Sequence, residues 1–247
     1  MIGPTPDIVT QLAPTGTLRA AINFGNPLLT ARDAATGEPR GIALDLAGEL
    51  GRRLGVPVAI VSFESPGAVA DAVKSGVWDV GLIGAEPQRA HDISFTAAYL
   101  EIEATYLVPP GSPLKTIADV DREGVRIAVL ARAAYDLYLS RNLKHAKLVG
   151  ENSFESTYQR FVADKLDAIA GLRAQLVDDV AKLPGSRLLD GRFTAVQQAI
   201  GTPKERVAGA QYLRAFVEDV KASGLMARII EKNGVRGVSV AGPALTL

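Results

Sequence analysis

The sequence predicts an α/β protein with two similar lobes, each an open sheet flanked by helices, joined by two hinge strands. Strand-like segments alternate with segments of helical spacing, an order typical of parallel βαβ units. Residues 78–83 are apolar with little alternation, as expected for a strand buried on both faces. The strings AVKSGVWDVGLIG and RFVADKLDAIAGL, one in each half, both predict a helix end, a small turn and a hydrophobic-Asp-apolar strand.

In the first half, a Pro-rich lead-in precedes a short strand that ends in the turn residues 23–27. Residues 33–40 are polar and predict a hairpin turn. Apolar residues recur at helical spacing over 44–54, and Gly55 is a typical helix stop. The predicted strands of this half are 18–22, 56–63 and 78–83, and the predicted helices are 44–54 and 67–75.

The second half repeats the alternation and is followed by a helical tail over 203–233, with a break near Ser223 and Gly224. Two segments, 106–113 and 194–200, are candidates for connections between the halves. We therefore expect one discontinuous lobe, 1–105 plus 200–247, and one continuous lobe, 106–199. The predicted strands of the second half are 125–130, 146–149 and 166–171, and the predicted helices are 133–142 and 154–163.

The composition excludes several classes of protein. The chain has 247 residues, with 27 basic and 27 acidic side chains, and 47% of its residues are hydrophobic. This is enough apolar material for a packed core, whereas zero net charge argues against a nucleic-acid partner. The absence of cysteine excludes disulfides, thiolate zinc sites and cysteine nucleophiles.

Enzyme motifs are also missing, and we expect no catalytic residues, no cofactor and no metal. The sequence has no GxSxG, HExxH, GxGxxG or P-loop string, and its two histidines leave few ligands for a metal or a triad. The carboxylates that could form an acid/base pair, or equally be surface charges, are Glu86, Asp92, Glu101 and Glu103.

The sequence leaves two alternatives for where the protein is located. No stretch approaches the roughly 20 uninterrupted apolar residues of a membrane-spanning helix. The first residues, MIGPTPD, lack the basic and apolar regions of a signal peptide. Either the protein stays inside the cell or a leader has been removed.

In open α/β sheets, ligands bind beyond the carboxyl ends of the strands, and polar residues follow three such ends here. Arg89 comes shortly after Gly84, which would let a ligand approach the backbone. An arginine fork matches a carboxylate, although a surface ion pair with Glu86 or Asp92 explains Arg89 equally simply.

The other two ends are also candidates. Arg132 precedes a predicted helix, where the helix dipole disfavours a cation unless an anion is near, although a solvated arginine is the alternative. Asn23 and Asn26 flank a glycine and precede a proline, so turn chemistry explains them without a ligand.

Several strings in a specific order resemble the type II periplasmic solute-binding proteins of ABC importers, namely the polar amino-acid class, bacterial extracellular solute-binding family 3. The resemblance extends from about Gly16 to Gly234. The matching strings are GTLR at 16–19, Gly41 with LDLA at 44–47, RLGV at 53–56, SGVWDV at 75–80, PQRA at 87–90, ISFT at 93–96, SPL at 112–114, IADV at 117–120 and SGL at 223–225.

The resemblance implies two lobes that close on a small solute, with Arg89 clamping its carboxylate beside the backbone of Gly84. The chain also departs from the family. Where the family often has an aromatic residue just before a proline, this chain has Asn26, and the family's second aromatic position falls near Pro66. The Gly-Thr or Gly-Ser that contacts the ligand in the family's second lobe is replaced by Arg132 and Ala133. Where the family has a Gly-Asp whose carboxylate binds the α-amino group of the ligand, this chain has Gly171 and Leu172.

Because a buried ammonium without a carboxylate is costly, these departures favour an anionic solute over a standard amino acid. The resemblance thus implies an importer's binding component, periplasmic and monomeric, with a small anionic or zwitterionic solute and a membrane permease as partners. The alternatives are a cyclohexadienyl-dehydratase-like enzyme with Glu86 as its acid, and a cytoplasmic sensor or orphan binder. The expected ligand-binding residues are Asn23, Asn26, Gly84, Glu86, Arg89, Arg132, Ala133 and Leu172.

Overall fold

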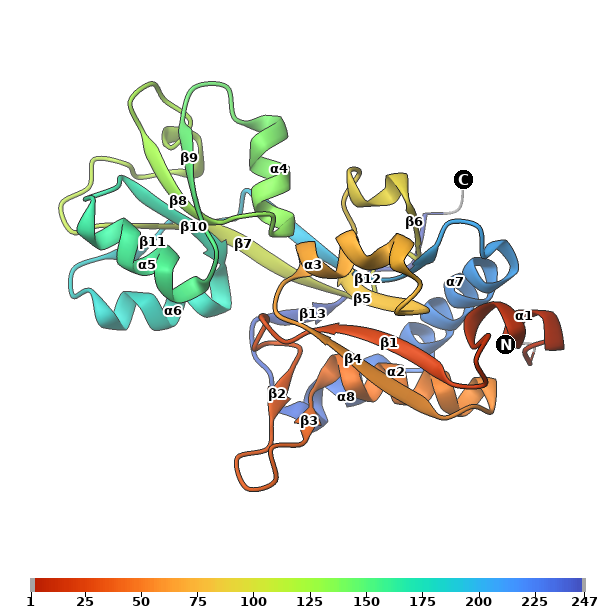
Figure 1. Ribbon diagram of the computed structural model, residues 1–247. Helices are drawn as coiled ribbons and strands as arrows, with labels where there is room; N and C mark the ends of the chain where they lie inside the picture. Colours follow the sequence, from red (N-terminus) through yellow and green to blue (C-terminus); the bar gives the residue numbers. More distant parts are fainter. Residues whose placement is uncertain (1–2, 246–247) are drawn as a thin grey trace. The chain divides into compact units, whose positions relative to one another are not determined.

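The computed structural model describes residues 3–245. The described residues form two compact units, one made of 3–101 and 197–245 and the other of 102–196 (Figure 1). The chain passes from one unit to the other within two strands, β7 (Leu100–Val108) and β12 (Thr194–Pro203). The α/β architecture, with an open sheet and flanking helices in each unit, confirms the predicted fold class.

The first unit has a sheet in the order β4-β1-β5-β12, in which β1 is parallel to both β4 and β5 and β12 is antiparallel to β5. A small hairpin of β2 and β3 stands apart from it. The strands of this unit, besides parts of β7 and β12, are β1 (Leu18–Asn23), β2 (Ala31–Arg32), β3 (Pro39–Arg40), β4 (Val58–Phe63), β5 (Val80–Gly84), β6 (Ile93–Phe95) and β13 (Val238–Val240).

Helices cover both faces of this sheet. A cluster around Trp78 and Val69 packs α3 against one face, and α2 contacts β1 and β4. Burial of β5 along its whole length explains why its sequence does not alternate. The helices of this unit are α1 (Pro6–Leu12), α2 (Ile42–Leu54), α3 (Pro66–Asp71), α7 (Val207–Ala222) and α8 (Leu225–Asn233), with the 3₁₀ turns η1 (Ala72–Ser75) and η2 (Arg89–His91).

The second unit has a sheet in the order β7-β10-β8-β9, with β8 parallel to β9 and β10, and β7 antiparallel to β10. Its core includes Phe161 and Leu176, from α5 and α6, packed on Leu107 and Ile169. The remaining elements are β8 (Arg126–Leu130), β9 (Lys147–Glu151), β10 (Ala168–Leu172), β11 (Arg187–Leu188), α4 (Ala134–Asn142), α5 (Phe154–Ala163), α6 (Arg173–Lys182) and the 3₁₀ turn η3 (Ile117–Asp119).

Two helices were not expected from the sequence. The Pro-rich lead-in contains α1, because Thr5 caps it through a hydrogen bond from the Ile8 amide and Pro6 occupies a first-turn position that favours proline. Helix α6 begins at Arg173, directly after the last residue of β10, so no turn residue marks its start. The predicted helix stop at Gly55 is confirmed by its left-handed backbone.

The repeated hydrophobic-Asp-apolar strings form the same contact in both units. Asp79 accepts the Arg19 amide at 2.9 Å, and Asp167 accepts the Arg126 amide at 2.8 Å. In each pair the aspartate amide also donates back to the arginine carbonyl. Asp79 therefore ties β1 to the segment leading into β5, and Asp167 ties β8 to the segment leading into β10.

The two aspartates differ in burial. Asp79 is fully buried and also accepts hydrogen bonds from the Arg19 side chain at 2.8 and 2.9 Å and from Arg206 at 2.7 Å. Burial alone would raise the pKa of Asp79, but the bonds from Arg19 and Arg206 outweigh it and hold the pKa below its ordinary value. Asp167 is 41% exposed, with Arg126 at 3.7 Å.

Two glycines in α2 are expected to respond oppositely to alanine. A Cβ on Gly51 would lie 2.2 Å from Cγ2 of Val58, whereas a Cβ on Gly48 would have no atom within 4 Å. We expect Gly48→Ala to raise the free energy of unfolding by about 0.5–1 kcal/mol, because glycine weakens a helix interior. We expect Gly51→Ala to lower it by about 1–3 kcal/mol through overpacking. Urea denaturation measures both, and changes of the same sign would contradict this account.

Candidate functional site

The carboxyl ends of three parallel strands share one edge of the first unit's sheet. Strand β1 pairs with β4 up to Asn23 and Phe63, and β5 lies on the other side of β1 and ends at Gly84. The sequence-predicted residues of this half, Asn23, Asn26, Gly84, Glu86 and Arg89, follow or end β1 and β5. Such an edge is where open α/β sheets bind ligands.

Arg89 lies in η2 and is buried, with 6% of its surface exposed. Its Nη1 donates a hydrogen bond to the carbonyl oxygen of Gly84 at 2.7 Å. The Gly84 carbonyl thus holds Arg89 in place, and the expected contact between the Gly84 backbone and a ligand stays a prediction. Arginine is seldom buried, so the burial of Arg89 sets it apart from an ordinary surface arginine.

The carboxylates considered as surface partners of Arg89 have different surroundings. Asp92 accepts from Lys74 at 3.0 Å and contacts the His91 ring at 3.0 Å. The hydrogen bond from Lys74 outweighs desolvation and holds the pKa of Asp92 below its ordinary value. Glu86 is half-buried. Its backbone carbonyl accepts a hydrogen bond from the Ala90 amide, and this bond spans the turn that contains Arg89.

Asn23 and Asn26 shape the loop after β1. The side-chain oxygen of Asn23 accepts the Gly25 amide at 2.8 Å, and that of Asn26 accepts the Leu28 amide at 3.1 Å. The carbonyl of Asn26 also accepts the hydroxyl and the amide of Thr30. This is the turn chemistry that the sequence allowed for these two residues.

The same loop presents an aromatic ring that the sequence reasoning missed. Phe24 follows β1 directly and is half-buried, and the Arg32 guanidinium lies 4.6 Å from its ring centroid. Arg32 is on the hairpin and also donates to the Gly37 carbonyl at 3.3 Å. The family resemblance implies an aromatic at Asn26, directly before Pro27, whereas Phe24 lies two residues earlier, directly after the strand.

In the second unit, Arg132 follows β8 by two residues and is exposed. Its backbone is left-handed, with φ at 64°, which is uncommon for a residue with a side chain. The Arg132 amide donates to the Asp136 carboxylate at 2.7 Å. Burial raises the pKa of Asp136, and this hydrogen bond opposes the rise.

Ala133 and Leu172 are small or apolar residues at the starts of helices. Ala133 is the N-cap of α4, and Leu172 ends β10 and is the N-cap of α6. Both are buried, and neither side chain carries a hydrogen-bonding group. Ala133 and Leu172 themselves can therefore offer a ligand only backbone groups for polar contacts.

Arg173 is a second residue that the sequence reasoning missed. It is the first residue of α6 and its Nε donates to Glu103 at 3.1 Å, while Nη2 donates to the carbonyl of Gly191. Arg192 lies 3.7 Å from the same carboxylate. A cation in a first helical turn is unfavourable without an anion, and Glu103 supplies one here. In the sequence, Arg173 could have been noticed because it directly follows Leu172, one of the expected ligand-binding residues.

Comparison with known families decides the classification. The family model for bacterial extracellular solute-binding proteins, family 3, matches residues 18–235. The chain belongs to this family. The resemblance inferred from the sequence is thereby confirmed, while no curated protein matches the chain significantly.

Solved structures share the fold of this family 3 protein. The P235GK mutant of ArgBP from T. maritima is 23% identical, with 92% of this chain and 99% of that one covered, at a TM-score of 0.74. An ancestral amino acid-binding protein, AncCDT-1, a precursor of cyclohexadienyl dehydratase, is 21% identical, with 91% and 98% covered, at 0.73. A putative ABC transporter binding component from Wolinella succinogenes, complexed with lysine, is 20% identical, with 88% and 95% covered, at 0.73.

Metal-binding clusters and membrane-crossing helices are both absent from residues 3–245 of this family 3 protein. These residues contain no group of three or more His, Asp or Glu side chains placed to hold a metal ion. Over the same range, no helix is both long and apolar enough to cross a membrane.

Proposed function

We propose that this family 3 protein is the solute-binding component of an ABC importer and that it acts outside the cytoplasm. The proposed solute is small and carries a carboxylate, which Arg89 of the first unit and Arg132 of the second hold when the two lobes close. A ligand that contacts both lobes favours the closed state, and the permease then recognises that state. The protein is proposed to be a monomer.

The observation that carries this proposal is the burial of Arg89 at the end of β5. Its hydrogen bond to Gly84 orients the guanidinium group. A fixed and largely desolvated arginine is well suited to bind a carboxylate through two parallel hydrogen bonds. Family membership supports the same role for Arg89.

The charges of the second unit support an acid that lacks an α-amino group. Leu172 stands where the family resemblance implies an ammonium-binding aspartate, and a cation, Arg173, follows it. Glu103 already accepts from Arg173, and Asp136 accepts from the Arg132 amide. An unpaired ammonium buried beside these groups would be costly.

A thermal-shift screen with matched ligand pairs tests the solute class. Each pair differs only in the α-amino group, for example succinate and aspartate, or glutarate and glutamate, with arginine and lysine added. We expect acids without the amino group to stabilise the protein, by roughly 2.7 kcal/mol at about 100 times their dissociation constant. Stabilisation by amino acids alone would overturn the inferred solute class.

The variant Arg132→Ala tests the second arginine separately. We expect it to weaken binding of the acid that gives the largest shift, measured by isothermal titration calorimetry. Because the Arg132 contact to Asp136 uses the backbone amide, the variant keeps that donor. Unchanged affinity for every carboxylate ligand would remove Arg132 from the proposal.

An enzymatic role is the second candidate, favoured by the half-buried Glu86 two residues after Gly84 and close in sequence to Arg89. In this role Glu86 would act as the acid of a cyclohexadienyl-dehydratase-like reaction. Incubation with prephenate and with arogenate, followed by chromatography, tests it. Turnover that Glu86→Gln abolishes would replace the binding role by the enzymatic one.

A further inference from the structure

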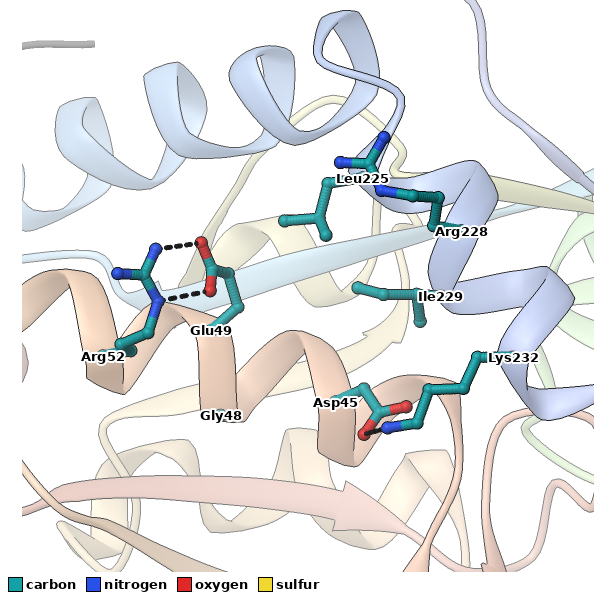
Figure 2. A pocket seen from close by; sticks show the side chains of 8 residues that line it. All are labelled: Asp45, Gly48, Glu49, Arg52, Leu225, Arg228, Ile229 and Lys232. Atoms are coloured by element: carbon teal, nitrogen blue, oxygen red, sulfur yellow. Dashed lines mark hydrogen bonds and ion pairs between the residues drawn. The ribbon is translucent and has the colours of Figure 1, made fainter.

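A hollow on the first unit lies between α2 and α8, which pack side by side (Figure 2). Its volume is about 320 Å³. Leu225 and Ile229 of α8 face the part of α2 that contains Gly48, and charged side chains surround this apolar centre. The lining residues are Asp45, Gly48, Glu49, Arg52, Leu225, Arg228, Ile229 and Lys232.

The room in the hollow comes from Gly48. This glycine is exposed, and a Cβ built on it would meet no atom within 4 Å. Gly51, one turn later, is different because Val58 packs against it and leaves no space for a side chain. Gly48 therefore weakens the helix without any gain in packing, and what it provides is space.

The charges around the hollow are unequal. Asp45 accepts from Lys232 at 3.0 Å and from Asn233 at 2.8 Å, and Glu49 accepts from Arg52 and Arg53. The hydrogen bond from Arg52, opposed by burial and helped by Arg53, lowers the pKa of Glu49 to about 2. Both carboxylates thus already have cationic partners.

The cations project further than the acids. Arg52 and Lys232 have side chains that are 71% and 70% exposed, while Asp45 and Glu49 are 27% and 15% exposed. Arg228 is exposed and donates to the Ser223 carbonyl, and within residues 3–245 it forms no ion pair with a carboxylate. A partner that reaches the hollow therefore meets positive charge around an apolar centre.

We propose that this hollow is the docking site for an acidic segment of a protein partner. An apolar side chain of the segment lies over Gly48, between Leu225 and Ile229. Its flanking carboxylates bind Arg228 and the outer donors of Arg52 and Lys232. The proposal does not depend on the solute that the protein binds.

A peptide titration of the full chain, followed by two-dimensional NMR of the backbone amides, tests the docking site. The probe is acetyl-Glu-Glu-Leu-Glu-Glu-amide. We expect saturable shifts of the amides of 45–52 and 225–232. Two matched peptides, with Gln in place of Glu or Gly in place of Leu, are expected to shift them much less. Equal shifts with all three peptides would overturn the proposal.

Protein variants locate the site without depending on the peptide's design. Gly48→Leu fills the hollow where no atom opposes it and is expected to abolish the shifts while the protein stays folded. Ala227→Leu adds the same side chain at an exposed position of α8 outside the hollow and should leave binding unchanged. Arg228→Glu is expected to weaken binding by about two- to fivefold or more.

The outcomes separate the possible occupants. Unaltered peptide binding by a folded Gly48→Leu variant would overturn the proposal. Binding to vesicles that contain phosphatidylglycerol, with no response to the acidic peptide, would also overturn it, since the surface would then be a membrane contact. A negative result for the docking site does not affect the solute screen, because the substituted residues are not at the carboxyl ends of the strands.

Discussion

Replacing Arg89 by alanine is expected to lower the affinity for the acidic solute by about 30-fold to several thousandfold. Truncating one partner of a buried charge pair costs about 2–5 kcal/mol, because the other charge is left desolvated and unpaired. Isothermal titration calorimetry with the most stabilising acid of the screen measures the loss. A folded Arg89→Ala variant with affinity within twofold of the parent would contradict the proposed role.

The Arg89 result needs three controls, because the side chain also donates to Gly84. Thermal melting shows whether the variant is folded. Arg89→Lys keeps the charge but loses the planar fork, so we expect an affinity between those of the parent and Arg89→Ala. Arg126→Ala removes an exposed arginine from the amino end of β8, the end that lies away from Arg132, and should leave binding unchanged.

The second large effect concerns stability. We expect Asp79→Asn to lower the free energy of unfolding at pH 7 by about 3 kcal/mol, because two partly buried arginines lose their shared counter-charge. Asp167→Asn is the matched control. It makes the same backbone contact but is 41% exposed, so its cost should stay within about 1 kcal/mol. Equal losses in the two variants would show that burial of the network is not the cause.

The effect of Asp79 depends on pH in a defined direction. Its pKa in the folded protein lies below that of an unfolded aspartate, about 3.9. The stability it contributes is therefore complete above about pH 5 and is lost as the pH falls through the folded pKa. Urea denaturation from pH 7 to pH 3 should show the difference between the parent and Asp79→Asn becoming smaller. A constant difference over this range would contradict the linkage.

Most of the order of strands and helices could be predicted from the sequence, because periodicity and turn residues act over short distances. The helix that ends before Gly55 and the break at Ser223 and Gly224 are of this kind. Helix α6 escaped prediction because it begins at Arg173 directly after a buried strand, where no local signal separates the two.

Arg89 could also be identified as a candidate ligand-binding residue from the sequence, because it follows the end of a strand and lies in PQRA, a string that resembles the family. Its burial and its hydrogen bond to Gly84 came from the structure. The roles of Asn23, Asn26, Gly84, Glu86, Arg89, Arg132, Ala133 and Leu172 in binding stay predictions. The sequence could allow turn chemistry for the two asparagines, and the structure supplied their bonds to the loop.

The pairs that matter most for electrostatics were decided by tertiary structure. Glu103 and Arg173 are 70 residues apart in sequence, and Asp79 and Arg206 are 127 apart. The hollow at Gly48 likewise needs α8 to pack against α2. A local pattern reports which face of an element is apolar, but only folding brings distant charges within a few ångströms, where burial determines their energy.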